Sequence, residues 1–250
     1  MSLKRILSVA MVSAVLAVSS SQAQDNAAAF DEKQTQAIEG IVKNYLLKNP
    51  ELLREVIAEL NRRQEVAASE KRKEALASIY KSDSPFATGT GKLTVVEFFD
   101  YNCGYCRHAF NEIVKLTDQE KDARVVFIEF PIMSEESRKA SEIAIAAARQ
   151  GKYFAFHQAL MAKQGPATEE KALQVAKDLG LNMDQLKKDR ESPETASTIE
   201  RNLALGTAMG VEGTPAFFVG DTASPGAPDD LRKQLSAHLG EVRKNGCSVC

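Results

Sequence analysis

The chain has 250 residues, of which 44% are hydrophobic and 26% charged, and its formal net charge is −2 at pH 7. This composition is typical of a globular protein rather than a disordered one. The near balance of charges argues against a nucleic-acid-binding protein, which would carry a basic stripe. The length allows one large domain, or one domain with an appendage.

Residues 1–23 have the pattern of a secretory signal. Lys4 and Arg5 precede the apolar stretch Ile6–Val18, and Ser21-Gln22-Ala23 supplies a small-x-small cleavage sequence. The apolar stretch is short for a membrane anchor, so we predict cleavage after Ala23, with a retained anchor as the alternative. The mature protein is then expected outside the cytoplasm without membrane insertion, in a bacterial periplasm, where disulfides persist.

Residues 24–60 are predicted to form an N-terminal helical segment with two amphipathic stretches on either side of Asn49-Pro50. Their apolar residues recur with the spacing of one helix face: Ile38, Ile41, Val42, Tyr45 and Leu46, then Leu52, Leu53, Val56, Ile57 and Leu60. Residues 61–84 follow as a charged helical linker that has little to bury. The linker separates the apolar stripes from the next domain, which favours self-association. Packing of the stripes on that domain is the alternative.

Residues 85–240 alternate strands and helices, which predicts an α/β fold. The expected elements are, in order, a strand at 93–99, a helix at 103–116, a strand at 124–130, a helical insertion at about 135–209, a strand at 216–219 and a helix at 229–239. Glycines and prolines divide the insertion into about five helices. Residues 241–250 are polar and are expected to form a mobile tail.

A C-x-x-C pair, Cys103 and Cys106, follows the first buried strand after a short turn. A dithiol at a helix start is typical of thiol–disulfide exchange. Free N–H groups at the helix start favour a thiolate at Cys103, the expected nucleophile, and Cys106 one turn later is the expected resolving thiol. The alternatives are a permanent disulfide, or half of a zinc site completed by Cys247 and Cys250.

Further residues near this dithiol have predicted roles. Gly104 lets a substrate backbone approach, and Tyr105 is expected to pack against the substrate or to tune the thiolate. About 110 residues later comes Gly213-Thr214-Pro215. We predict a cis Pro215 opposite the dithiol, with Gly213 and the Thr214 backbone beside an extended substrate.

Glu97 lies six residues before Cys103 inside the apolar strand. A poorly solvated carboxyl there would exchange a proton with Cys106. The alternative is an edge-strand glutamate that faces water. Among the three histidines, His108 is the one close to the dithiol in sequence, whereas surface or core roles are expected for His157 and His238.

Two of these segments, Val95–Cys106 and Gly213–Phe217, together with the run from Ser137 to His157, resemble the periplasmic DsbA-like proteins. The resemblance covers about residues 91–239. It implies a thioredoxin fold with an inserted helical domain, an acid kept at the Glu97 position, no required cofactor, and cysteine-containing secreted proteins as partners.

The front of the chain, Ile41–Leu53, resembles the N-terminal oligomerisation segment of the suppressor of copper sensitivity C proteins, which are trimeric DsbA-like disulfide isomerases. Gly104-Tyr105 and Thr214 are also similar to isomerases, since the prototype oxidase has Pro-His and Val there. The resemblance implies an oligomeric isomerase, with a trimer favoured, that a membrane thiol reductase keeps reduced. The alternatives are a monomeric dithiol oxidase with a membrane oxidase partner, and a Cu(I)-binding protein.

The second pair, Cys247 and Cys250, has several interpretations. It is a loose disulfide of the tail, a shuttle for the main dithiol, or a soft thiolate site for Cu(I). Cu(I) binding by reduced Cys103 and Cys106 is suggested by the copper-related relatives alone.

Overall fold

The computed structural model of the protein describes residues 30–250. The predicted signal sequence 1–23, with its cleavage site, lies outside the described residues. The described residues fall into two compact units, 30–58 and 59–250. Within the described residues, no helix is long and apolar enough to cross a membrane.

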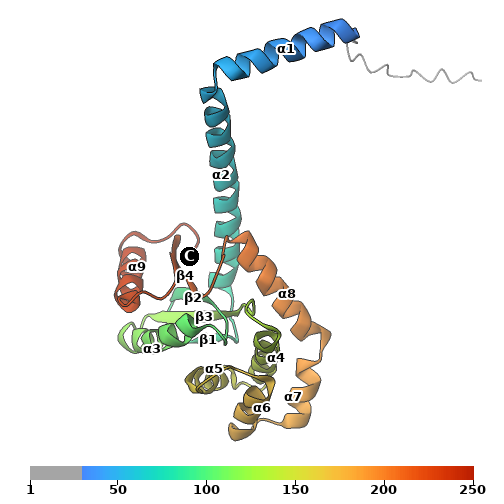
Figure 1. Cartoon of the computed structure of the whole chain (residues 1–250). Helices are drawn as coiled ribbons and strands as arrows, with labels where there is room; N and C mark the ends of the chain where they lie inside the picture. Colours follow the sequence, from blue (N-terminus) through green and yellow to red (C-terminus); the bar gives the residue numbers. More distant parts are fainter. Residues whose placement is uncertain (1–29) are drawn as a thin grey trace, which may run out of the picture. The chain divides into compact units, whose positions relative to one another are not determined.

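The secondary structure follows the expected order with small shifts in the boundaries (Figure 1). The helices are α1 (Glu32–Lys48), α2 (Glu51–Lys81), α3 (Gly104–Gln119), α4 (Glu135–Arg149), α5 (Tyr153–Ala162), α6 (Glu169–Asp178), α7 (Met183–Arg190), α8 (Pro193–Ala208) and α9 (Leu231–Asn245). The strands are β1 (Ala87–Thr88), β2 (Leu93–Phe99), β3 (Ala123–Glu129), β4 (Ala216–Val219) and β5 (Thr222–Pro225). The predicted helical insertion comprises five helices, α4 to α8, as expected.

The N-terminal unit exposes its apolar side chains. Helix α1 begins with a capping box, in which Asp31 accepts a hydrogen bond from the Gln34 backbone at 2.8 Å and Gln34 returns one at 3.0 Å. None of the residues of α1 is buried in the described part of the chain. Ile41 is 69% exposed and Tyr45 59% exposed. Helix α1 therefore presents large apolar side chains at its surface.

The sheet of the second unit has the strand order β1-β3-β2-β4-β5. Strands β2 and β3 are parallel, and the other neighbouring pairs are antiparallel. In this register Glu97 of β2 lies between Phe127 of β3 and Phe217 of β4. Strand β2 is therefore central, so Glu97 is not the water-facing edge glutamate of the alternative interpretation.

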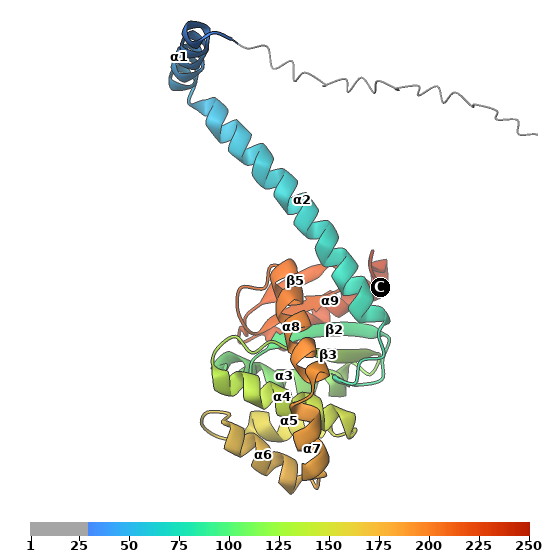
Figure 2. The same ribbon diagram turned by 90° about the vertical axis from the view of Figure 1, so that its right-hand side faces the viewer.

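Alternate side chains of the sheet enter two separate cores, as the period of two in a strand requires. Val95 and Phe99 join one core with residues of α3, α9 and the insertion helices α4 to α7. Val96 and Phe98 join the other with the end of α2 and with Met209. Figures 1 and 2 place α4 to α7 on the same side of the sheet as α3.

The end of α2 is anchored to this second core. Leu76 is buried, and the Tyr80 hydroxyl donates to the Gly220 carbonyl at 2.8 Å. Arg124 of β3 donates to the carbonyls of Tyr80 at 2.6 Å and Ser82 at 3.0 Å. The predicted charged linker thus continues as one helix into the domain, because its last two turns have apolar side chains to bury.

The structure corrects the expectation of a mobile polar tail from residue 241. Helix α9 continues to Asn245, and Val249 is only 8% exposed in the second core. Gly240 does not end the helix, because a glycine costs a helix only about 1 kcal/mol, and Leu239 and Val242 pack against the first core on either side of it.

Candidate active site

Cys103 lies at the junction between the central strand and α3. It is the N-cap residue of α3, and its sulfur accepts a hydrogen bond from the backbone N–H of Cys106 at 3.3 Å. The same sulfur lies 3.2 Å from the Thr214 carbonyl oxygen. The Thr214–Pro215 peptide bond is cis. The structure therefore brings together the two sequence segments that were predicted to face one another.

The two thiols have opposite electrostatic surroundings. Hydrogen bonds from the Cys106 thiol, from the Thr214 side chain and from the N–H groups of Cys106 and Tyr105 lower the pKa of Cys103 to about 6. Burial raises the pKa of Cys106 far above that of a free thiol, and the hydrogen bond to Cys103 and the charge of Glu97 raise it further. At neutral pH, Cys103 is thus mainly the reactive thiolate, and Cys106 keeps its proton.

Glu97 is buried on the same face of the sheet as the dithiol. It exposes 1% of its surface, and its Oε2 atom has no hydrogen-bond partner among the described residues. Burial and the negative charge of Cys103 raise the pKa of Glu97 well above its usual value. Glu97 also contributes to the raised pKa of Cys106. Glu97 and Cys106 are thus two buried acids that both resist ionisation, which suits them to passing one proton between them.

Asp100, which sequence analysis missed, fixes the loop between β2 and α3. This carboxylate is 1% exposed, and its Oδ1 accepts from the Asn102 backbone at 2.7 Å. Its Oδ2 accepts from the backbone N–H groups of Ile132 and Met133, each at 2.9 Å. Asp100 therefore joins the dithiol loop to the loop after β3.

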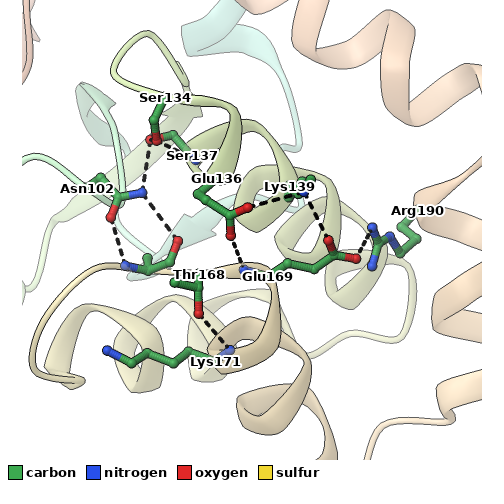
Figure 3. A network of polar contacts seen from close by, with 10 residues as sticks. Asn102, Ser134, Glu136, Ser137, Lys139, Thr168, Glu169, Lys171 and Arg190 are labelled. Carbon is green, nitrogen blue, oxygen red and sulfur yellow. Dashed lines mark hydrogen bonds and ion pairs between the residues drawn. The ribbon is translucent and has the colours of Figure 1, made fainter.

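Asn102, immediately before Cys103, attaches the same loop to the helical insertion (Figure 3). Its side-chain amide donates to Ser137 at 3.1 Å and to the Ala167 carbonyl at 3.3 Å, and it accepts from the Ala167 backbone at 2.7 Å. Beyond it, Glu136 accepts from the backbone N–H of Glu169 at 2.6 Å. These bonds make the insertion a support for the dithiol loop.

A buried polar cluster lies beneath this loop. The Tyr101 hydroxyl contacts Glu129 at 3.2 Å and His157 Nδ1 at 3.1 Å, and the Tyr153 hydroxyl donates to Glu129 at 2.9 Å. Burial raises the pKa of Glu129 to about 8 and lowers that of His157 to about 3. His157 therefore has a core position, as expected.

A groove of about 860 Å³ opens beside Cys103. Its lining includes the predicted Gly104, Tyr105, Gly213 and Thr214, and also His108, Ile132, Met133, Ala227 and Asp229. Tyr105 is 70% exposed, Ile132 45% and Met133 56%. The exposed apolar rim can contact an extended chain with apolar side chains. Ile132 and Met133 carried no sequence signal, because only the fold brings their loop to the dithiol.

The second cysteine pair is distant from the first. Cys247 and Cys250 form a disulfide, and Cys247 lies beside Gly220, at the end of β4 away from Thr214. The four cysteines therefore do not meet as a zinc site. Residues 30–250 also contain no group of three or more His, Cys, Asp and Glu side chains placed to hold a metal.

The sheet, the dithiol at a helix start and the cis proline define a thioredoxin-like dithiol protein. The DSBA-like thioredoxin domain family matches residues 94–236, and the copper resistance protein ScsC N-terminal domain matches residues 34–67. The chain therefore belongs to the DSBA-like thioredoxin domain family, and it is a thiol–disulfide oxidoreductase. Proteins of this family need no cofactor for such exchange.

Solved structures show the same likeness. A thioredoxin-like oxidoreductase from Silicibacter pomeroyi is 43% identical, with a TM-score of 0.60, over 63% of this chain and 91% of the other. ScsC from Proteus mirabilis, in a transitional conformation, is 28% identical, with a TM-score of 0.62, over 85% and 98%. Both likenesses include the dithiol domain, and the ScsC likeness extends further along this chain.

Among curated proteins, an Na⁺/H⁺ antiporter NhaA from Herminiimonas arsenicoxydans is 32% identical over 129 residues. The match covers 51% of this chain but about a fifth (21%) of the antiporter's length. A probable disulfide bond formation protein D from Bacillus anthracis is 27% identical over 65% of this chain and 77% of its own. The antiporter match therefore gives no indication of ion transport by this chain.

The lowered pKa of Cys103 predicts how its reactivity depends on pH. Because only the thiolate is alkylated, the rate with iodoacetamide should rise through about pH 6 and level off near neutrality, whereas a free cysteine continues to rise to about pH 8.5. Mass spectrometry of the Cys103 peptide measures this rate. In Cys106→Ala the midpoint should move upward, since the Cys106 thiol is the largest cause of the shift. A wild-type midpoint near that of free cysteine would contradict the assignment.

We propose Glu97 as the proton acceptor for Cys106. Glu97→Gln cannot accept that proton, so release of a Cys103 mixed disulfide should slow by about tenfold or more, while the pH midpoint of Cys103 stays unchanged. Rapid quenching and alkylation measure the release. Glu129→Gln is the matched control, since it also removes a buried carboxyl but leaves this proton path intact. Equal release rates in wild type and Glu97→Gln would exclude the role.

Proposed function

We propose that the chain is a periplasmic, self-associating disulfide isomerase that acts on misoxidised secreted proteins. The Cys103 thiolate attacks a wrong disulfide and forms a mixed disulfide, which either rearranges within the client or is released by Cys106. The observation that carries the proposal is the exposed apolar stripe of the N-terminal unit, because a single-domain oxidase would not need such a surface.

The stripe is well suited to association between copies. Its side chains lie at helical spacing on α1 and the start of α2, and each is worth about 1.5–3 kcal/mol when fully buried. Val56 is 64% exposed and Ile57 is 56% exposed, and the exposed fractions of Ile41 and Tyr45 are similar. The match of residues 34–67 to the ScsC N-terminal domain supports this role. A trimer is the favoured assembly, because the segment resembles that of trimeric relatives.

The dithiol site supports exchange with protein clients. The groove beside Cys103 has an exposed apolar rim at Tyr105, Ile132 and Met133, which suits segments that a misfolded chain exposes. Several such sites in one assembly raise the effective concentration of thiolate around a bound client. An isomerase needs its dithiol reduced, so a membrane thiol reductase is the expected partner. A monomeric oxidase would need a membrane oxidase instead.

Charge in the stripe tests the assembly directly. Ile41→Glu with Tyr45→Glu should convert an oligomer into a monomer, because both side chains are exposed in the single chain and lie one turn apart. Reactivation of scrambled ribonuclease should fall by at least about tenfold, while reduction of a small disulfide stays unchanged. Sedimentation velocity and the two assays measure these effects.

The control for this test is Gln36→Glu with Asn44→Glu, which adds the same charge to α1 outside the stripe and should leave the assembly intact. Wild-type protein that sediments as a monomer at micromolar concentration would reduce the proposal to the oxidase.

Cu(I) binding is a second candidate function. Cys103 and Cys106 are outside any disulfide and lie within one helical turn, and thiolates are preferred ligands of Cu(I). In an anaerobic titration against a competing chelator, reduced protein should take up Cu(I). Cys103→Ser with Cys106→Ser should lose this uptake, and Cys247→Ser with Cys250→Ser should keep it. Absence of uptake by the fully reduced protein would remove this function.

A further inference from the structure

The segment that carries the second cysteine pair is docked on the domain. Gly246, with a φ of 72°, turns the chain after α9, and Val249 enters the core that also contains Leu76 and Tyr80. Ser248 donates to the Asp221 carboxylate from its backbone at 3.2 Å and from its hydroxyl at 3.0 Å. The disulfide therefore has a fixed orientation relative to the sheet, unlike a disulfide in a mobile tail.

Docking makes the two sulfurs of this disulfide unequal. Cys247 is half-buried against the second core. It packs closely on Gly220, since a Cβ atom added to that glycine would lie 3.2 Å from the Cβ atom of Cys247. Cys250 is exposed. The backbone N–H of Cys250 donates to the Cys247 sulfur at 2.8 Å. An incoming thiolate therefore meets Cys250 first, and the sulfur that would leave already has a hydrogen-bond donor.

The same local contact occurs at the catalytic dithiol. There the N–H of Cys106 donates to the sulfur of Cys103 at 3.3 Å and helps to lower its pKa. A C-x-x-C segment in this conformation thus stabilises a thiolate on its first cysteine. For the second pair, that thiolate is the leaving group of an attack on Cys250, and a better leaving group speeds disulfide exchange.

We propose that Cys247 and Cys250 form a second thiol–disulfide exchange site, open at the Cys250 sulfur to a thiolate on another molecule. The thiolate bonds to Cys250, the Cys247–Cys250 bond breaks, and the electron pair leaves on Cys247. A second thiolate, on the same dithiol donor or on a second molecule of a small thiol, then attacks the donor sulfur and releases Cys250. The two donor thiols become a disulfide, and the pair gains two electrons; the reverse sequence returns them.

The donor is a different molecule because the two sites lie at opposite ends of β4. Thr214, which contacts Cys103, precedes the strand, and Gly220, which contacts Cys247, follows it. The three steps of the strand alone span about 10 Å, and exchange requires direct contact between sulfurs. An exposed thiolate of this kind belongs either to a small thiol such as glutathione or to the catalytic dithiol of a second copy.

The test uses full-length Cys103→Ser with Cys106→Ser, in which the second pair is oxidised. The result is thus independent of the proposed isomerase activity. In one arm reduced glutathione is the donor; in the other, the donor is the reduced Cys247→Ser, Cys250→Ser variant. Acid quenching, alkylation and mass spectrometry measure the rate at which each donor reduces the Cys247–Cys250 disulfide. For reference, the same reaction is measured with the acceptor protein unfolded in guanidinium and each donor thiol at the same concentration. This reference gives the rate for a fully accessible disulfide.

At least one donor should reduce the native pair at a rate within about tenfold of the unfolded reference, since no unfolding is needed to reach Cys250. Reaction with glutathione alone identifies small thiols as the source, and reaction with the variant identifies a second copy. The trapped adduct should be on Cys250 in at least about tenfold excess over Cys247. Slower reduction by both donors, or an adduct mainly on Cys247, overturns the proposal.

Val249→Ser supplies a control for the docking. This change removes the apolar contact with the second core but keeps both cysteines, so Cys247 should become accessible and the adduct ratio should fall towards one. Introduced into the otherwise wild-type chain, the same change should leave the alkylation rate of Cys103 unchanged. An adduct ratio equal to that of the parent would show that docking does not select the sulfur.

Discussion

The structure depends on one local contact, in which a sulfur takes the place of the usual oxygen at a helix N-cap. Cys103 accepts the N–H of Cys106 at the start of α3, so one of the helix's unpaired donors is directed at the nucleophile. The contact requires that the chain turn sharply after β2. The buried Asp100 and the amide of Asn102 fix that turn, and they do so by binding backbone groups of the loop after β3 and of the insertion. The helical insertion is in this sense part of the site.

The chemistry follows from how negative charge is distributed over three neighbouring groups. Cys103 has donors and a groove beside it, so its thiolate is favoured. Cys106 and Glu97 are enclosed by the sheet and α3, so each resists ionisation. One charge therefore stays on the sulfur that meets a client. When that sulfur is capped in a mixed disulfide, its charge is lost, and the cost of ionising the two enclosed groups falls accordingly. The site thus changes its own proton affinity during the reaction.

Sequence reasoning found the parts of the fold that have strong periodicity or special residues. The central strands, the five-helix insertion, the dithiol helix and the cis Pro215 were all predictable, because apolar runs, glycines and the C-x-x-C spacing mark them. Strands β1 and β5, with two and four residues, were missed. The partner of β1 is the distant β3, and β5 pairs with the adjacent β4 but is short and mostly exposed. Asp100 and Asn102 were missed because the sequence does not show whether a polar side chain in a turn faces water or bonds to a group 32 or 65 residues away.

The tail shows how a single buried side chain changes the meaning of a polar segment. Composition indicated mobility after residue 240, yet Val249 has a place in the second core, and burying one such side chain contributes about 1.5–3 kcal/mol. Docking places the second disulfide at the far end of β4 from the first dithiol, with the sheet between them. Exchange within one chain is thereby prevented, so any traffic between the two pairs requires another molecule. Self-association through the N-terminal stripe would supply that molecule at high effective concentration. The stripe, the catalytic dithiol and the second disulfide would then act together, although they lie far apart in the sequence.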